Sequence, residues 1–135
     1  MSGYKILIAD DDPMMASILS AALTTRGHAV SIAKDAMQAV MFAVKQQPNL
    51  VLLDVNMPAG TGLGALKKLK ASEKTSSIPV VVISGSSDMT LPATVRADGA
   101  RAYFKKPVDL EKLCVQLEEL MRQGPEKAAP TLSAK

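Results

Sequence analysis

The sequence predicts an α/β fold in which five short strands alternate with five helices. Short apolar runs recur along the 135-residue chain, and segments with helical apolar spacing stand between them. Continuous apolar runs are typical of parallel strands that are covered by helices on both faces of the sheet. The chain contains two Tyr, two Phe and no Trp, so its core must be built mainly from aliphatic side chains.

Polar residues follow four of the five expected strands. The strands are expected at residues 6–9, 29–33, 50–53, 80–83 and 102–104. Asp10 and Asp11 follow the first strand, and Asp54 follows the third. Ser84 follows the fourth strand, and Lys106 lies just beyond the fifth. The carboxyl ends of parallel strands share one edge of the sheet, where ligands bind in open α/β folds, so these side chains are expected to converge.

Three of the expected helices have polar N-caps. Asp12 is placed to cap the first helix, with Pro13 at the first helical position. Asp35 is placed to cap the second helix, and Gln38 three residues later completes a capping-box pattern. Asp109 is placed to cap the fifth helix, which has the clearest apolar periodicity. The expected stop signals of these helices are Gly27, Pro48 and Gly124–Pro125.

The third and fourth helices have weaker signals. The third helix is marked by three leucines at helical spacing, Leu63, Leu66 and Leu69. A fourth helix that began near Asp88 would have Pro92 in its middle, and an interior proline costs about 3 kcal/mol. A start at Leu91 or Pro92 avoids that cost. The sequence therefore predicts a short or mobile fourth helix.

The strand order follows from the alternation of strands and helices, because right-handed crossovers leave few topologies. We expect the flavodoxin-like three-layer sandwich, whose parallel sheet has the strand order 2-1-3-4-5. That order brings Asp10, Asp11 and Asp54 into one crevice. The domain is expected to span residues 1–123. The small, polar and proline-containing residues 124–135 are expected to form a disordered tail.

Composition and charge limit the class of protein. The single cysteine, Cys114, excludes an internal disulfide and lies on an apolar helical stripe that favours a packing role. There is no room for a signal peptide before the first strand and no apolar run long enough to cross a membrane, so a cytoplasmic protein is expected.

The net charge of +3 is mild, and the lysines within residues 67–74 are interpreted as a solvated helix face. Neither zinc-finger spacing nor aromatic interleaving supports direct DNA binding.

Asp10, Asp11 and Asp54 would form a cluster of carboxylates at neighbouring strand ends. Such groups repel one another unless a cation or a shared proton relieves them. Oxygen-only ligands favour Mg²⁺, with Mn²⁺ as the alternative, and Mg²⁺ coordination is commonly completed by water and phosphate oxygens. His28 is expected at the opposite end of the sheet, which leaves no histidine for a zinc site.

Other groups around this cluster suit a phosphoryl group. Lys106 can reach over the crevice as a point charge. The Ser84 hydroxyl can donate to a phosphoryl oxygen, and the backbone amides of Gly85 and Ser86 could do likewise. The set lacks a general base, but Asp54 is itself an anionic nucleophile, and attack on phosphorus depends mainly on positioning and charge neutralisation.

One motif indicates a different ligand. Residues 60–65 match the dinucleotide-binding fingerprint G-x-G-x-x-A. The motif does not open directly from a strand, and the next strand ends in Ser84 rather than in an acid that could bind a ribose. Nucleotide binding is therefore not expected.

Four segments carry a joint sequence signature: Ile6–Asp11, Leu53–Pro58, Val82–Gly85 and Tyr103–Pro107. Together they resemble the receiver domain of bacterial two-component response regulators, over about residues 4–122. The chain is similar to the stand-alone, chemotaxis-regulator-like members of that family. The resemblance implies a phosphorylation-controlled binding module that catalyses only its own phosphorylation and dephosphorylation, and not a turnover enzyme.

The resemblance implies a role for each residue around the carboxylates. Asp54 would accept a phosphoryl group from a sensor histidine kinase or a histidine phosphotransfer protein. The side chains of Asp11 and Asp54 and the backbone carbonyl of Asn56 would bind Mg²⁺, and Asp10 would act through a metal-bound water.

The resemblance also implies how the signal leaves the site. Ser84 and Lys106 would contact the phosphoryl group, and the ring of Tyr103 would follow the hydroxyl inward. This shift between two populated states would alter the face made by the fourth helix, fifth strand and fifth helix, and with it the binding of a downstream protein. Asn56 and Ser86 would flank the phosphate and tune its hydrolysis.

Two alternatives remain open at this point. A phosphatase of the haloacid-dehalogenase type also uses an Asp nucleophile and Mg²⁺, but such enzymes normally carry a second Asp where this chain has Asn56. A degenerate receiver would bind its partner without phosphorylation, although all the acceptor residues are present here.

Overall fold

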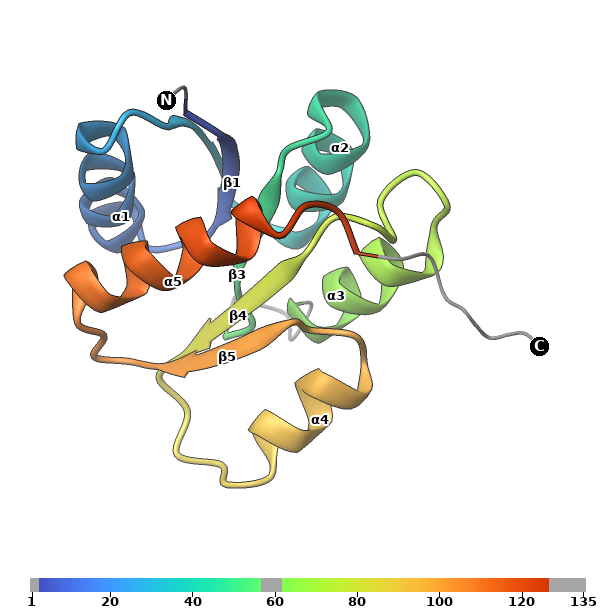
Figure 1. The fold of residues 1–135 in the computed structure, drawn as a ribbon. Coiled ribbons are helices and arrows are strands. Elements are labelled where there is room, and N and C mark those ends of the chain that lie inside the picture. Colours follow the sequence, from blue (N-terminus) through green and yellow to red (C-terminus); the bar gives the residue numbers. More distant parts are fainter. Residues whose placement is uncertain (1–2, 57–61, 127–135) are drawn as a thin grey trace.

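The computed structural model describes residues 3–56 and 62–126, which form one parallel sheet of five strands (Figure 1). The strands are β1 (Lys5–Ala9), β2 (Ala29–Ala33), β3 (Leu50–Asp54), β4 (Val80–Ser84) and β5 (Ala102–Lys105). Their order, β2-β1-β3-β4-β5, confirms the prediction. Because β1 pairs directly with β3, with Ala9 opposite Leu53, the carboxyl ends of these two strands meet at the topological switch point.

Helices cover both faces of the sheet (Figure 1). They are α1 (Pro13–Thr25), α2 (Ala36–Gln46), α3 (Gly62–Ala71), α4 (Leu91–Ala97) and α5 (Leu110–Arg122). α1 and α5 share one apolar core with the sheet, and α2, α3 and α4 share the other. β3 and β4 are buried at every position, which explains their uninterrupted apolar sequences. Within the described residues, none of these helices has the length and apolar character that a membrane crossing needs.

The predicted N-caps form at three helices. Asp12 and Asp109 accept hydrogen bonds from backbone N–H groups in the first turns of α1 and α5. Asp35 accepts the backbone N–H of Gln38 at 2.8 Å, as a capping box requires. In a complete capping box the Gln38 side chain would accept the N–H of the N-cap residue, Asp35. Here Gln38 Oε1 accepts the N–H of Lys34 instead, at 2.9 Å. The Gln38 side chain therefore ties down the residue before the N-cap.

α4 is as short as its proline predicts. It spans seven residues and begins at Leu91, so that Pro92 lies in the first turn, where no helical N–H is needed. Asp88 shapes the approach to the helix, since its Oδ1 accepts the N–H and the hydroxyl of Thr90 at 2.9 and 2.7 Å. These hydrogen bonds lower the pKa of Asp88. Leu91 and Val95 anchor α4 in the core.

The structured part of the chain reaches at least to Glu126, beyond the boundary expected at residue 123. The backbone N–H of Glu126 donates to the carbonyl of Ser77 at 2.8 Å. Its carboxylate accepts a hydrogen bond from Lys70 Nζ, also at 2.8 Å. These contacts hold the segment after α5 against α3 and the approach to β4. The rest of the expected tail, residues 127–135, lies outside the described residues.

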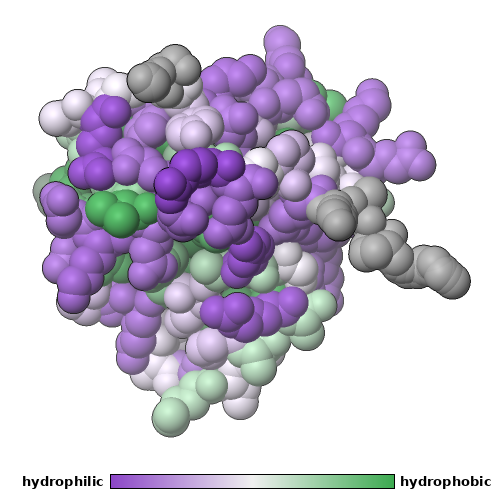
Figure 2. Space-filling model, in the orientation of Figure 1, coloured by the Kyte–Doolittle hydropathy of each residue, from purple (hydrophilic) through white to green (hydrophobic). Residues whose placement is uncertain are grey.

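The contact between α1 and α5 has an apolar interior, and apolar side chains of α1 are exposed beside it. Cys114 is 3% exposed in this core, which agrees with a packing role, and burial raises the pKa of its thiol. Figure 2 shows hydrophobic side chains on the face where these two helices lie side by side. Met14 and Ile18 of α1 are 72% and 43% exposed. α1 therefore presents apolar surface to solvent close to the carboxyl edge of the sheet.

A polar network fixes α5 to the amino-terminal edge of the sheet. His28 Nδ1 accepts the backbone N–H of Tyr4 at 3.1 Å, so Nε2 carries the ring proton and donates to Glu118 at 2.8 Å. Arg26 adds two N–H bonds to the same carboxylate, both of 2.8 Å. The hydrogen bond from Arg26, helped by His28 and opposed by partial burial, lowers the pKa of Glu118 to about 2.

Glu118→Gln is expected to lower the free energy of unfolding at pH 7 by about 1 kcal/mol, the upper end for a partly exposed ion pair. The folded-state pKa is depressed, so the wild-type carboxylate stabilises the fold above its ordinary pKa of 4.5 and loses this effect as the pH falls toward 2. Urea unfolding of both proteins between pH 7 and pH 2.5 measures the difference, which should shrink below about pH 4.5. A difference that stays constant over that range would contradict the ion pair.

Candidate functional site

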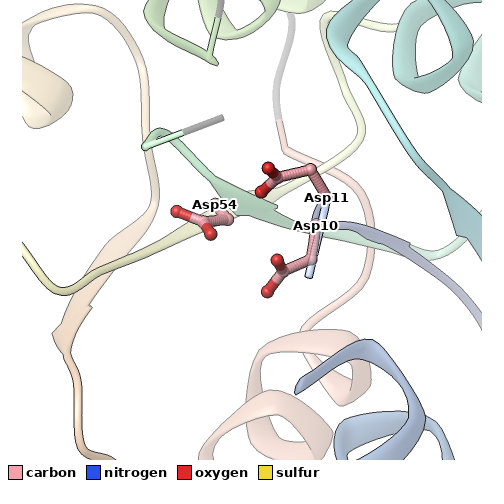
Figure 3. Close-up of side chains that lie close together, drawn as sticks. All are labelled: Asp10, Asp11 and Asp54. Carbon is pink, nitrogen blue, oxygen red and sulfur yellow. The ribbon is translucent and has the colours of Figure 1, made fainter. Parts of the chain in front are cut away.

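Three carboxylates meet at the carboxyl ends of β1 and β3 (Figure 3). Asp54 is the last residue of β3, and Asp10 and Asp11 follow β1 directly. Each offers one oxygen, and these oxygens lie within 4.8 Å of one another. Asp10 and Asp54 are only 2% and 3% exposed, whereas Asp11 is exposed. The structure thus brings together the three acids that the strand order predicts.

Lys106 lies over the two buried carboxylates. Its Nζ donates to Asp54 Oδ2 at 3.1 Å and lies 3.6 Å from Asp10 Oδ2. The pairing of β4 with β5 places this lysine, because its backbone N–H donates to the carbonyl of Ser84 at 2.8 Å. Burial alone would lower the pKa of Lys106, but the hydrogen bond to Asp54 and the charge of Asp10 outweigh it and raise that pKa. The amine is therefore a fixed positive charge beside Asp54.

Asp10 has fewer partners than its burial demands. Its Oδ1 accepts the backbone N–H of Asp12 at 2.9 Å. Its Oδ2 is buried and has no hydrogen-bond partner among the described residues. Burial raises the pKa of Asp10, the Asp12 N–H and Lys106 oppose this, and the charge of Asp54 adds to it. Because Lys106 reaches this oxygen only at ion-pair distance, 3.6 Å, and no hydrogen bond forms, the position favours a further cation.

The donor set fits a hard divalent cation. The three acids supply only oxygen ligands, and the exposure of Asp11 leaves an open side for water or phosphate oxygens, as Mg²⁺ requires. The single histidine, His28, is held by Tyr4 and Glu118 at the other edge of the sheet. The acidic cluster is therefore able to hold a metal ion that prefers oxygen.

The end of β4 is hydrogen-bonded to Asn56. Ser84 Oγ accepts the backbone N–H of Ser86 at 3.0 Å and donates its proton to Asn56 Oδ1. The N–H of Gly85 donates to the same oxygen at 3.2 Å. The backbone N–H of Asn56 in turn donates to Asp54 Oδ1 at 2.8 Å. The three donors that were expected for phosphoryl oxygens at the end of β4 are therefore all engaged within the protein. The Ser86 amide donates to Ser84 rather than into the crevice.

The hydrogen bonds of the Asn56 side chain are the part of the site that sequence reasoning missed, since Asn56 was expected to flank the phosphate but not to contact Ser84 and Gly85. The pairing of β3 with β4 places Asp54 opposite Ile83, and the same register continued by two residues places Asn56 opposite Gly85. This register is set by the packing of β3 on β4 and is not readable from either segment alone. Residues 57–61, which include Met57 and Pro58 of the sequence signature, lie outside the described residues.

Tyr103 lies on β5, three residues before Lys106. It stands opposite Val82 of β4 and is half-buried. Its ring packs against the core that includes Leu91 and Val95 of α4. The strand that leads to Lys106 is therefore in contact, through Tyr103, with the core that anchors α4.

Known sequences place the chain in one family. The model of the response regulator receiver domain matches residues 6–118. Protein PilH from Pseudomonas aeruginosa is 37% identical over 109 residues, which are 81% of this chain and 90% of PilH. The DNA-binding dual master transcriptional regulator RpaA from Synechocystis sp. is 31% identical over 119 residues, which are 88% of this chain and 49% of RpaA. The chain spans about half the length of RpaA and of several other curated relatives.

Solved structures agree with the sequences. The CheY-like response regulator receiver domain protein from Methanospirillum hungatei has a TM-score of 0.83 and 25% identity, with 90% of this chain and 96% of that chain covered. The chemotaxis protein CheY4 of Vibrio cholerae has a TM-score of 0.81 and 25% identity, with 88% of this chain and 99% of that chain covered. The chain therefore belongs to the response regulator receiver domain family.

Proposed function

We propose that this chain accepts a phosphoryl group on Asp54 and signals through a phosphorylation-controlled change in protein binding. The donor would be a sensor histidine kinase or a histidine phosphotransfer protein, as suits a member of this family. The observation that carries the proposal is the fixed ammonium of Lys106, 3.1 Å from a buried carboxylate that shares its cluster with two further acids. Such a site combines a nucleophile with charges suited to a phosphoryl group.

In the proposed step, an oxygen of Asp54 attacks the phosphorus of a phosphohistidine. The new P–O bond forms as the P–N bond breaks, and the electron pair of that bond leaves with the donor's imidazole. Asp54 needs no general base because it attacks as an anion. Lys106 balances negative charge as the phosphoryl oxygens approach the carboxylates.

Mg²⁺ would be held by the side chains of Asp11 and Asp54 and by the backbone carbonyl of Asn56, with Asp10 acting through a bound water. Asp10 Oδ2, which pairs with Lys106 at 3.6 Å but accepts no hydrogen bond within the described residues, and the oxygen-only donor set support this assignment. When bound, the ion would supply positive charge against the oxygens of the transferred group. Mn²⁺ would fit the same ligands.

Labelling with a small phosphodonor tests the proposal. Incubation of the wild-type chain with Mg²⁺ and an acyl phosphate or phosphoramidate is expected to add one phosphoryl group, detected by intact-mass spectrometry. Peptide mapping should locate the group on Asp54, and EDTA should prevent the gain. A phosphoryl group on another residue, or labelling that survives removal of the metal, would contradict the proposal.

We propose further that the chain is not a turnover enzyme. Asn56 stands two residues after Asp54, and an amide there cannot give a proton to a leaving group as a carboxylic acid would. Many cycles of hydrolysis of p-nitrophenyl phosphate per chain would overturn this view.

An apolar groove beside Lys106 suits the docking of a phosphodonor protein. It is lined by Met15 and Ile18 of α1 and by Pro107 and Leu110 before and in α5. Lys106, whose ammonium contacts Asp54, also lines the groove, so a protein seated there could present a phosphohistidine to the site. The exposed α1 surface in Figure 2 is part of this face.

Ile18→Glu is expected to slow transfer from a histidine phosphotransfer protein at least about tenfold, because a carboxylate in an apolar contact costs more than about 1.4 kcal/mol. Ile18 is 43% exposed, so the fold should tolerate the change. Labelling by acetyl phosphate needs no docking and should stay at the wild-type rate. Equal slowing with both donors would show that the substitution damages the site rather than a docking surface.

The proposed output is a contact at the face made by α4, β5 and α5. Tyr103 packs against the core that holds Leu91 and Val95, so a change at the end of β4 can alter the position of α4.

We propose the cytoplasm as the compartment, because the single buried cysteine suits a reducing environment.

A further inference from the structure

The hydroxyl of Ser84 and the N–H of Gly85 share one acceptor, the side-chain oxygen of Asn56. We propose that the Asn56 carboxamide is an internal occupant of the position that a phosphoryl oxygen takes, so that a phosphoryl group on Asp54 must displace it. Asn56 is then a positioning residue that sets how tightly the site holds a phosphoryl-type anion. The inference rests on the proposed function, since it assumes that the phosphoryl group is bound at Asp54.

The hydrogen-bond directions identify the Asn56 atom at this position. A backbone N–H can only donate, so the atom that faces Gly85 must be the oxygen and not the amide nitrogen of Asn56. Ser84 Oγ accepts the N–H of Ser86 at 3.0 Å, which leaves its own proton free to point at the same oxygen. Asn56 Oδ1 therefore accepts two donors, as an oxygen of a bound phosphoryl group would.

The backbone of Asn56 explains why its side chain reaches this position. Its N–H donates to Asp54 Oδ1 at 2.8 Å, which fixes the residue against the acceptor carboxylate. From there the carboxamide extends to the end of the neighbouring strand β4. The side chain therefore bridges the atom that would be phosphorylated and the donors that would receive a phosphoryl oxygen.

The Asn56 carboxamide and a phosphoryl oxygen cannot both bind the Ser84 and Gly85 donors. Ser84 is completely buried, so its hydroxyl needs a protein or ligand partner in every state of the site. A phosphoryl oxygen can gain the Ser84 and Gly85 donors only as Asn56 loses them. An anionic oxygen accepts stronger hydrogen bonds than an amide oxygen, so replacement of Asn56 by a phosphoryl oxygen is favourable. The gain in free energy is smaller than it would be if the two donors had no partner beforehand. The Asn56 side chain thus lowers the affinity without blocking the site.

Asn56→Ala is expected to bind beryllofluoride, in the presence of Mg²⁺, three- to tenfold more tightly than the wild-type chain does. The substitution frees both donors in the unbound protein, and a tenfold gain corresponds to about 1.4 kcal/mol, the size of one or two net hydrogen bonds. Alanine keeps the backbone carbonyl and the N–H of residue 56. Titration calorimetry measures the dissociation constant, and equal or weaker binding by the variant overturns the inference.

A double-mutant cycle with Ser84→Ala isolates the contact. In the Ser84→Ala background only the Gly85 donor remains for Asn56 to occupy. The further gain from Asn56→Ala should then be clearly smaller than the gain measured in the wild-type background. An equal gain in both backgrounds would overturn the inference, because Asn56 would then act on the anion by another route.

A crystal structure of the wild-type chain with Mg²⁺ and beryllofluoride tests the same exchange without any variant. Asn56 Oδ1 should lie beyond hydrogen-bond distance of Ser84 Oγ and Gly85 N, with fluorine atoms in its place. An Asn56 that keeps both contacts, in a chain that a small phosphodonor still labels on Asp54, overturns this inference alone. Failure of both the labelling and the binding of beryllofluoride would overturn the proposed function and this inference together.

Discussion

Asp54→Asn is expected to abolish phosphorylation of the chain while leaving it folded. The amide has the shape of the carboxylate but is not an anionic nucleophile, so no P–O bond forms. Asp54 is buried beside Asp10, and removal of one of two neighbouring negative charges relieves repulsion. The amide loses part of the ionic contact with Lys106, which lies at 3.1 Å in the wild-type chain. These effects oppose each other, so the free energy of unfolding should change little.

Asp12→Asn is the matched control for this substitution. Asp12 directly follows Asp11 but is not one of the three clustered acids, and it caps α1 through a side-chain oxygen that asparagine also provides. Intact-mass spectrometry after incubation with acetyl phosphate and Mg²⁺ should show one phosphoryl group on this variant and none on Asp54→Asn. Labelling of Asp54→Asn at the wild-type rate would refute Asp54 as the acceptor. Loss of labelling in both variants would point to general damage at the carboxyl edge.

The position of the candidate site could be predicted because it depends on local patterns and on one topological rule. Asp10 and Asp54 each end an apolar run, and a (βα)5 chain with right-handed crossovers places those two runs side by side. The short α4 followed from Pro92 alone, because the cost of an interior proline exceeds what a few residues of helix can recover.

The partners of individual polar side chains could not be predicted in this way. Glu118 and His28 are far apart in the sequence, and nothing in the spacing of either indicates the other. The Ser84–Asn56 bond and the Lys70–Glu126 ion pair depend likewise on how separate elements pack. A side chain on an isolated segment has many possible partners, and only tertiary packing selects one of them. The sequence therefore predicts where polar groups gather better than it predicts which atoms they contact.

Gly62→Ala is expected to destabilise the chain by about 3 kcal/mol or more. A Cβ atom at Gly62 would lie 2.4 Å from the Cα atom and 2.6 Å from the carbonyl oxygen of Val55. Both atoms belong to the backbone, so no side chain can rotate to make room, and either α3 or the end of β3 must shift. Val55 stands between Asp54 and Asn56, so the shift would also move the acceptor. Slower labelling should accompany the loss of stability.

Gly64→Ala separates this close approach from the helix propensity of glycine. A Cβ atom at Gly64 would have no heavy atom within 4 Å, and the residue is exposed in α3. Alanine favours a helix over glycine by up to about 1 kcal/mol, so this variant should be more stable than the wild type. Urea unfolding of both variants measures the free energy of unfolding, which should fall in Gly62→Ala and rise in Gly64→Ala. Opposite signs would explain the glycine at position 62 by its contact with the Val55 backbone, without the pyrophosphate that the G-x-G spacing suggests. Equal effects would rule out this backbone contact as the reason for glycine at this position.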